Sequence, residues 1–557
     1  MNKASFIFVL HSHLPYVRKK GKWPHGEEMV FEAIAETYIP LLNGLNDLLA
    51  TGYHPRLTIS LTPILLEQLA DEYMKDEFVA YLQVRMKACS EDMVIYSTAK
   101  IIKDKVERQK HKALAKFYLD FYKTALDSFT ETYNRDIVGA FKALQEKEVL
   151  DIITSSATHA YLPLYQDQDT INEQLKVGIQ TYERYLGTKP RGIWLPECGY
   201  RPAKSGQEGF ESLLQKHAIQ YFFTDSHVFS SSMHINKKEY VLHGPYDYKE
   251  IQYEEVTDSD HRVDKPTFRP YTVEKSKVAV FARDKLTSLQ VWSGDFGYPG
   301  DFAYREFHAK DAISGLQYCR ITSRSGLTEK ELYEPVKAAE RVIDHAKHFV
   351  HLVEERAKDV YAETGEYACI VSSYDTELFG HWWFEGVDWL MNVFKGFEES
   401  EIVQVSKADV YIKETPKLQK IAIPESSWGL GGQHHVWLND ETAWIWPIIE
   451  DLSNKVKTTK QDFPHAEGFE KDLLNQALRE LLLLHASDWP FLISTVQARE
   501  YAIERFIEHK ERCEKLLEFA YREEPLTEEE KLLVAEMIDS DNPFPELDYT
   551  TFGELPR

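Results

Sequence analysis

Two stretches of the sequence place acidic side chains directly after short apolar runs. Glu197 lies in WLPECGY, and Asp375 lies in SSYDTELFGHWW. Cleavage of a glycosidic bond with retention needs two carboxyl groups about 5–5.5 Å apart, one as nucleophile and one as proton donor. The ends of two strands in one sheet could bring this pair together. For Glu197 alone, a buried ion pair with Arg191 or Arg201 explains the same sequence equally well.

Histidines and a further aspartate follow other apolar runs. His11 and His13 form a His-Ser-His pair, His159 lies in SATHAY, and Asp295 follows Trp292 closely. Such side chains at strand ends can ligate zinc, as in metal-dependent deacetylases and mannosidases on related barrels. Alternatively, they hydrogen-bond a sugar ring or orient the carboxylates. The aromatic residues around them favour contact with sugar over a metal site.

Tryptophans are concentrated in polar, glycine-containing segments. Trp292 precedes SGDFGYPGD, and residues 428–446 contain four tryptophans, including Trp428 and Trp437. Flat aromatic faces can stack on a sugar ring, and glycines let the backbone approach a ligand. Four tryptophans at mixed spacing are unsuited to one buried face, so we expect one or two to reach a cleft. Asp488, in HASDWPF, is a further cleft candidate, although the end of a helix explains this segment too.

The polar clusters are predicted to lie at the ends of strands. Several of the preceding runs are apolar throughout, which is typical of parallel strands buried on both faces. Helical stretches separate most of them, so the pattern predicts a somewhat irregular α/β barrel with its active site at the carboxyl ends of the strands. The predicted strands are Ser5–Leu10, Arg56–Leu61, Asp151–Ser155, Gly192–Leu195, Gln220–Phe223, Ser288–Trp292 and Tyr367–Val371.

Other regions break this rhythm. Residues 67–148 are helical and highly charged, and they are too long for a normal crossover, so they predict an inserted helical subdomain. Residues 246–277 are polar and Tyr-rich and predict a long loop over the barrel mouth. The predicted units are a catalytic barrel (1–66 and 149–400), the insertion (67–148) and a C-terminal helical domain (401–557), with Leu473–Leu484 and Glu500–Phe519 as its clearest helices.

The charge balance limits the partners. The 557 residues include 90 Asp and Glu against 65 Lys and Arg, a formal charge of −25. Such a field repels nucleic acid and anionic membranes but not a neutral polymer. The N-terminus lacks the pattern of a signal peptide, and no apolar run approaches the ~18 residues of a membrane span. Five scattered cysteines, never spaced as CxxC, favour a reducing compartment, most simply the cytoplasm.

Five motifs, in order along nearly the whole chain, resemble those of glycoside hydrolase family 57. Within that family they are most similar to the α-1,4-glucan branching enzymes. The opening motif carries an extension that resembles these enzymes in particular. The motifs are HSHLPYVRKKGKWPHGEE, SSATHAYLPL, WLPECGY, YDTELFGHWWFEG and HASDWPF.

The resemblance implies a retaining mechanism on an incomplete (β/α)7 barrel with a helical C-terminal domain. It also implies an α-1,4-glucan as the substrate and no metal or cofactor. By position, Glu197 would be the nucleophile and Asp375 the general acid–base. His13 and His159 would line the subsite around the scissile bond, and three of the tryptophans would stack on glucan. The full set of predicted substrate-binding residues is His11, His13, His159, Trp292, Asp295, Trp428, Trp437 and Asp488.

The acceptor decides the product. A glucan 6-hydroxyl gives an α-1,6 branch, and water gives a shortened chain. Branching enzymes of this type carry a loop whose tyrosine shields the intermediate from water. Here Tyr246, Tyr248, Tyr253 and Tyr271 are the candidates. An α-amylase-type hydrolase is the alternative within the family. A glucan-binding protein without activity and a zinc-dependent deacetylase or mannosidase are the alternatives from other classes.

Overall fold

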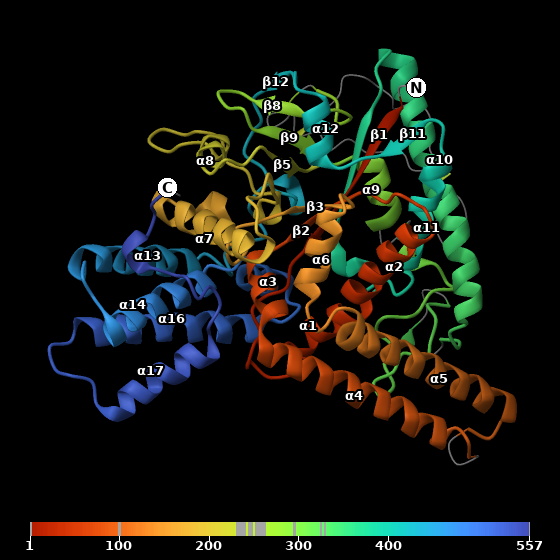
Figure 1. Ribbon diagram of the computed structural model, residues 1–557, viewed down its shortest axis with the longest axis horizontal. Helices are drawn as coiled ribbons and strands as arrows, with labels where there is room; N and C mark the ends of the chain where they lie inside the picture. The colour runs from red at the N-terminus through yellow and green to blue at the C-terminus, as the bar shows by residue number, and fades with distance from the viewer. Residues whose placement is uncertain are drawn as a thin grey trace.

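Parallel strands lie at the centre of the molecule, with helices around them and a helical region towards the C-terminus (Figure 1). The computed structural model describes residues 3–98, 102–229, 241–242, 249–250, 263, 265–292, 297–322, 326–327 and 330–555. The central strands are β1 (Ala4–Ser12), β2 (Leu57–Leu61), β3 (Leu150–Ile153), β4 (Gly192–Ile193), β5 (Tyr221–Thr224), β9 (Ala279–Ala282) and β10 (Cys369–Asp375).

These strands are arranged as a barrel. In parallel register, β10 pairs with β1, β1 with β2 and β2 with β3, while β4 pairs with β5 and β5 with β9. A bridge between Thr154 and Ile193 joins β3 to β4. On the other side, the amide of Asp284 donates to the carbonyl of Val371 in β10 at 2.7 Å. In the part of the chain that the structure describes, this is an incomplete (β/α)7 barrel, because β9 and β10 share no ladder.

Short strands extend both halves of the barrel. β11 (Val403–Val405) pairs with β1, and β12 (Lys420–Ile421) pairs with β8 (Tyr271–Val273), which is antiparallel to β9. The chain therefore stays with the sheets as far as Ile421, beyond the domain boundary predicted at residue 401. β6 (Val241–Leu242) and β7 (Lys249–Glu250) form a separate antiparallel pair.

Six of the seven predicted strands are confirmed, and one is wrong. Residues 288–292 belong to the helix α9 (Lys285–Trp292), and the strand is the preceding run β9. The reason is local: the carboxylate of Asp284 accepts a hydrogen bond from the amide of Thr287 at 3.0 Å. An aspartate in this position caps a helix and starts it three residues earlier than the apolar run suggests.

Helices connect the barrel strands. α7 shows the local signals clearly: Asp167 caps its first turn through the amide of Thr170, and Gly187 ends it in the left-handed conformation. The connecting helices are α1 (Glu28–Ala33), α2 (Ile39–Ala50), α3 (Pro63–Ala70), α6 (Ile137–Glu146), α7 (Gln168–Leu186), α8 (Phe210–Lys216), α10 (Pro335–Thr364), α11 (Gly386–Glu399) and α12 (Ala408–Glu414).

The region predicted as an inserted subdomain contains two long helices, α4 (Glu72–Ile95) and α5 (Lys105–Asp127). They lie side by side and project away from the strands (Figure 1). The phenol of Tyr118 donates to the carbonyl of Gln317, and that of Tyr318 donates to Asp92 at 2.6 Å. These contacts tie the helix pair to the segment before α10. The helices are confirmed, and their status as a separate subdomain stays a prediction.

The C-terminal region is helical as predicted. The two helices expected from their apolar spacing correspond to α14 and α16. The final segment includes the short 3-10 helix η12 (Tyr549–Thr551) and is packed on the protein, because Phe544, Tyr549 and Phe552 are buried. No helix in the described parts of the chain has the length and apolar character needed to cross a membrane. The helices are α13 (Ile445–Asp462), α14 (Gly468–Leu484), α15 (Asp488–Thr495), α16 (Arg499–Tyr521) and α17 (Glu528–Ser540).

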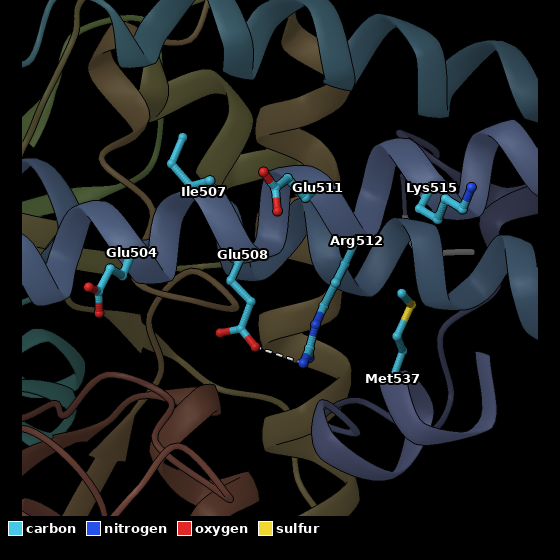
Figure 2. A pocket seen from close by; sticks show the side chains of 7 residues that line it. All are labelled: Glu504, Ile507, Glu508, Glu511, Arg512, Lys515 and Met537. Atoms are coloured by element: carbon cyan, nitrogen blue, oxygen red, sulfur yellow. Dashed lines mark ion pairs between the residues drawn. The ribbon is translucent and has the colours of Figure 1, made fainter. Parts of the chain in front are cut away.

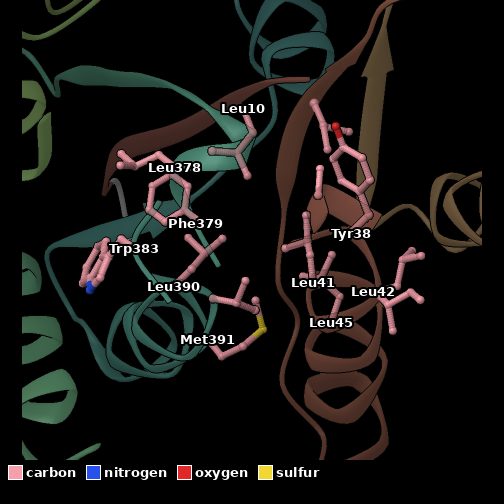
Figure 3. Close-up of a cluster of buried hydrophobic side chains, with 14 of the residues drawn as sticks. Leu10, Tyr38, Leu41, Leu42, Leu45, Leu378, Phe379, Trp383, Leu390 and Met391 are labelled. Atoms are coloured by element: carbon pink, nitrogen blue, oxygen red, sulfur yellow. The ribbon is translucent and has the colours of Figure 1, made fainter. Parts of the chain in front are cut away.

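A buried apolar layer supports the barrel from outside. Figure 3 shows Leu41 and Leu45 of α2 facing Leu390 and Met391 of α11. The two helices approach closely at Gly44, where an added Cβ would lie 2.8 Å from the side chain of Met391. Each leucine buried in this way contributes about 1.5–3 kcal/mol to folding. This layer holds α2, which lies between β1 and β2, against α11, which follows β10, and so fixes the segments that leave the ends of β1 and β10.

Candidate active site

Both predicted catalytic carboxyl groups lie at the carboxyl ends of barrel strands. β10 ends at Asp375, which is opposite His11 in the parallel register of β1 and β10. His13 follows β1 directly. Glu197 lies after β4, in the short 3-10 helix η4 (Pro196–Cys198). Parallel strands end on the same side of a barrel, so these side chains share its mouth, where barrel enzymes hold their chemistry.

Glu197 is held in an uncommon backbone conformation. Its φ of 60° and ψ of 26° are left-handed, which is rare for residues other than glycine and is concentrated at functional sites. The indole N–H of Trp428 donates to Oε2 at 2.6 Å, and the Ser487 hydroxyl donates to Oε1 at 3.4 Å. The backbone amide of Trp428 also donates to the carbonyl of Glu197 at 2.9 Å. The two side-chain donors orient the carboxylate and stabilise its charged form, and the backbone bond holds the Glu197 main chain beside Trp428.

Burial raises the pKa of both carboxyl groups. The pKa of Glu197 rises to about 7, with the charge of Asp375 adding to the effect and the Trp428 hydrogen bond opposing it. Burial raises the pKa of Asp375 to about 6, against the opposing charges of Arg283 and His13. Near neutral pH the two groups therefore titrate together as a coupled pair. The pKa of Glu197 lies above that of Asp375, so it is the N–H and O–H donors on Glu197, and not the order of the two pKa values, that mark it as the carboxylate and leave Asp375 as the proton donor.

The histidines form a stacked cluster beside this pair. Nε2 of His11 lies 3.0 Å from Nε2 of His159, whose Nδ1 lies 2.8 Å from the Ser487 hydroxyl. The ring of His159 stacks on that of His13 at 3.9 Å, and the ring of His11 stacks on Trp194 at 5.0 Å. Burial holds the pKa of His11 and of His159 well below the usual value. Both are therefore neutral. The two ring nitrogens of His159 are occupied by His11 and Ser487, whereas Nδ1 of His11 has no hydrogen-bond partner among the described residues and is the nitrogen that can bond a sugar hydroxyl.

His13 differs from the other two histidines because it has an acidic partner. Its Nε2 lies 3.0 Å from Oδ2 of Asp488, the first residue of α15, and its Nδ1 lies 3.2 Å from the Thr62 hydroxyl. Burial lowers the pKa of His13, but the charge and hydrogen bond of Asp488 outweigh it and leave the pKa raised. A protonated His13 donates to Asp488 and places a positive charge near Glu197.

An arginine–aspartate pair that the sequence did not reveal lies at the same mouth. Arg283, directly after β9, donates to both carboxylate oxygens of Asp225 at 3.0 and 2.9 Å, and its guanidinium lies 5.8 Å from the ring centre of Trp428. Burial alone would raise the pKa of Asp225, but Arg283 holds it well below its usual range. Asp225 could have been identified from its position after a predicted strand. Arg283 could not, because the sequence placed the strand at 288–292 and not at β9, which Arg283 follows.

A third carboxyl group accompanies the pair. Glu377 is 3% exposed, two residues after Asp375, and accepts a hydrogen bond from the phenol of Tyr38. Tyr38 ends the π-helix η1 (Ile34–Tyr38), a feature that often marks functional sites. Burial raises the pKa of Glu377 to about 8, and the charge of Asp375 adds to this. Glu377 is thus protonated at neutral pH. The Asp-Thr-Glu spacing was the signal that could have identified it.

The tryptophans have different environments. Trp428 contacts Glu197, as described above, and Trp292 is 46% exposed at the end of α9. Trp437 is only 1% exposed, and its ring stacks on Tyr161 at 4.1 Å. In this structure Tyr161 stacks on one face of the Trp437 ring, and the expectation that Trp437 stacks on sugar stays a prediction.

Several predicted residues lie outside the described residues: Asp295, Tyr246, Tyr248 and Tyr253. Of the four candidate shielding tyrosines, the structure describes Tyr271. It is fully buried in β8, its ring stacks on Phe229, and its phenol donates to the carbonyl of Pro266 at 2.9 Å. It is therefore a core residue and does not shield the site.

One group among the described residues has the geometry to hold a metal ion, and it lies in the C-terminal helical region. Ligand atoms of Glu480, His509 and Asp541 lie within 4.8 Å of one another. Arg505 can only donate, and it lies 3.0 Å from Nε2 of His509, so the proton sits on Nδ1, which donates to Glu480 at 2.7 Å. Lys20 already pairs with Asp541 at 3.1 Å. These contacts make the group a buried hydrogen-bonded network.

A surface hollow of about 500 Å³ lies on α16 and α17 (Figure 2). An ion pair of 2.7 Å joins Glu508 and Arg512 along its wall. None of the predicted site residues lines it, so we assign it no part in the chemistry. Its lining residues are Glu504, Ile507, Glu508, Glu511, Arg512, Lys515 and Met537.

The sequence matches the model of glycosyl hydrolase family 57 over residues 7–424. The chain belongs to this family. Residues 448–552 match a second model, described as the C-terminal region of 1,4-alpha-glucan branching enzymes. The first match thus spans the barrel strands with Glu197 and Asp375, and the second spans Ser487 and Asp488.

Relatives of this family 57 member cover almost the whole chain. A 1,4-alpha-glucan branching enzyme of Thermococcus kodakarensis is 41% identical over 97% of this chain and 77% of the relative. The crystal structure of a GH57-type branching enzyme from Pyrococcus horikoshii superimposes with a TM-score of 0.86 at 40% identity, covering 100% and 98% of the two chains. An alpha-amylase structure from Thermotoga maritima gives a TM-score of 0.82 at 30% identity, covering 99% of each.

Proposed function

We propose that this protein is a 1,4-alpha-glucan branching enzyme. The observation that carries the proposal is the coupled pair of Glu197 and Asp375, two buried carboxyl groups with raised pKa values at one barrel mouth. Neutral His159 lies beside the nucleophile, with its Nδ1 3.8 Å from Oε1 of Glu197. The match of residues 448–552 to the branching-enzyme C-terminal model supports transfer over hydrolysis. The negative charge of the chain suits a neutral polymer, and the scattered cysteines support a cytoplasmic location.

The reaction proceeds in two steps. Asp375 donates its proton to the departing glycosidic oxygen while the carboxylate of Glu197 attacks the anomeric carbon, and a covalent glucosyl-enzyme forms. Asp375, now ionised, takes the proton from a glucan 6-hydroxyl, which attacks the same carbon and releases Glu197. Trp428 holds the nucleophile in position through its 2.6 Å hydrogen bond. Charged His13, near Glu197, stabilises the negative charge before the attack.

A second candidate function is hydrolysis of α-1,4-glucans. The specific observation that favours it is the similarity to the alpha-amylase from Thermotoga maritima, which extends over 99% of both chains. The same carboxyl pair serves both reactions, and the second step alone differs, because water replaces the sugar hydroxyl.

Substitution of the two carboxyl groups tests the proposal. Glu197→Gln and Asp375→Asn should each lower turnover of amylose by at least about 1,000-fold, because each removes a group that reacts. Asp151→Asn is a matched control: Asp151 is also a buried barrel carboxyl with a pKa of about 7, but it lies near the start of β3. It should retain activity within about threefold. Near-wild-type turnover in the folded Glu197→Gln protein would refute the assignment.

A further inference from the structure

A buried arginine of the C-terminal region contacts both segments that carry the His13–Asp488 pair. Arg505, in α16, is 4% exposed. Its Nη1 donates to the carbonyl of Tyr16 at 2.8 Å, and Tyr16 follows His13 by three residues. Its guanidinium also lies 5.2 Å from the ring centre of Trp489, the residue next to Asp488. One side chain therefore links the two segments whose polar groups meet at 3.0 Å in the active site.

Both of these partners of Arg505 are themselves held in place. Tyr16 is 3% exposed, and its phenol oxygen accepts a hydrogen bond from the amide of Asn542 at 3.2 Å. Trp489 is 1% exposed, and its indole N–H donates to the carbonyl of Leu483 at 2.9 Å. Closely packed groups have little room to absorb a displacement. Movement of the guanidinium is therefore passed on to the residues beside its partners.

The buried network described above fixes the orientation of the guanidinium. Nη2 of Arg505 donates to Nε2 of His509 at 3.0 Å, and His509 donates to Glu480 at 2.7 Å. Nη1 also donates to the phenol of Tyr501 at 3.1 Å, and Nε lies 3.4 Å from Oε2 of Glu508. Because a guanidinium presents its donors in a rigid planar fork, these contacts together set its position. The network directs Arg505 towards the two segments.

We propose that Arg505 is a positioning residue that holds His13 and Asp488 in contact. The proposal rests on the proposed function and adds to it a residue from outside the barrel. Tyr16 lies within the match to the family 57 model, whereas Trp489 and Arg505 lie within the match to the branching-enzyme C-terminal model. Arg505 therefore joins the two matched regions beside the reacting groups.

The pKa of His13 reports whether this contact is kept, because the charge and hydrogen bond of Asp488 raise it. Loss of the positive charge of Arg505 would by itself raise the pKa of His13. A fall in that pKa is thus no direct effect of the missing charge. Five other titratable groups face His13 and are unaltered in the variants below: His11, His159, Glu197, Asp375 and Glu377.

NMR titration of His13 and kinetics on amylose test the proposal together. Arg505→Met removes the guanidinium and keeps a long side chain, whereas Arg505→Lys keeps the charge beside Glu508 but not the planar fork. Arg512→Gln is the matched control. Arg512 also belongs to α16, lies about two turns further along it, and pairs with the same Glu508 at 2.7 Å (Figure 2). Asp488→Asn, alone and combined with Arg505→Met, completes the set.

The expected changes follow from the loss of the contact. Arg505→Met should lower the pKa of His13 by about 1 unit or more and reduce kcat/KM about tenfold through displacement of His13. Arg505→Lys should cause a smaller change in the same direction. Arg512→Gln should change neither quantity, even where it lowers the free energy of unfolding as much. In Asp488→Asn protein, Arg505→Met should lower the pKa of His13 no further.

Three results would overturn the positioning role. They are an unchanged or raised pKa of His13 in Arg505→Met, a further fall in the Asp488→Asn background, and an equal fall in Arg512→Gln, which general destabilisation would explain. If Arg505→Met does not fold, Arg505→Lys decides in its place, and an unchanged pKa of His13 there overturns the role as well. Unaltered protein without activity on amylose would instead contradict the proposed function, and the titration would still decide whether Arg505 holds the contact.

Discussion

Replacing Trp428 with phenylalanine isolates the hydrogen bond that holds the nucleophile. The substitution removes the indole N–H that lies 2.6 Å from Oε2 of Glu197 and keeps an aromatic ring. A hydrogen bond to a charged group contributes about 1.5–3 kcal/mol, and one pKa unit corresponds to about 1.4 kcal/mol. Because this bond lowers the pKa of Glu197, its loss should raise that pKa by about 1–2 units from about 7.

The direction of the effect on rate follows from the role of Glu197. The nucleophile must be ionised, so the acidic limb of the pH profile of kcat/KM should move to higher pH by the same 1–2 units. Initial rates on amylose from pH 5 to pH 9 measure it. Ser487→Ala serves as the control. The Ser487 hydroxyl makes a longer hydrogen bond to Glu197, at 3.4 Å, so its removal should shift the acidic limb by a smaller amount. An unmoved limb, or one that moves to lower pH, in folded Trp428→Phe protein would show that this hydrogen bond does not lower the pKa of Glu197.

Three further predictions concern neighbouring groups. Asp488→Asn should lower the pKa of His13, measured by NMR titration, because the charge and hydrogen bond that raise it are lost. The acidic limb of kcat/KM should move little, because the charge of Asp488 also raises the pKa of Glu197 and its removal offsets the loss of the charge on His13. Glu36→Gln should cost about 3–5 kcal/mol in the free energy of urea unfolding, since it leaves Arg305 buried without its partner. Burial would raise the pKa of Glu36, but the charge of Arg305 outweighs it and lowers that pKa to about 2. The stabilisation from the ion pair is therefore present above about pH 4.3 and is lost as the pH falls towards 2. The unaltered protein should show this loss of stability, and Glu36→Gln should not. A chelator should leave activity on amylose unchanged, whereas a zinc-dependent enzyme would lose it.

The sequence was informative where a local pattern decides the structure. Continuous apolar runs identified six strands of the barrel, and the polar residues at their ends identified Glu197, Asp375 and His13. The strand at 288–292 failed because apolar content alone does not distinguish a short strand from a buried helix. The cap at Asp284, with its bond to Thr287, was the deciding signal.

Long-range contacts could not be predicted in the same way. The partner of Glu197 is Trp428, 231 positions later, and the partner of Glu377 is Tyr38, 339 positions earlier. Such pairs depend on which strand ends and loops meet at the barrel mouth. Trp437 shows the converse: the tryptophan-rich segment around it suggested a sugar contact, whereas in the folded protein its ring stacks on Tyr161.

Branching activity is measured by incubating the protein with linear amylose while two signals are followed together. Proton NMR measures new α-1,6 linkages, and a reducing-sugar assay measures new chain ends. A branching enzyme should form the linkages well ahead of the reducing ends. Reducing ends that accumulate with few new linkages would contradict the proposed function and identify a hydrolase.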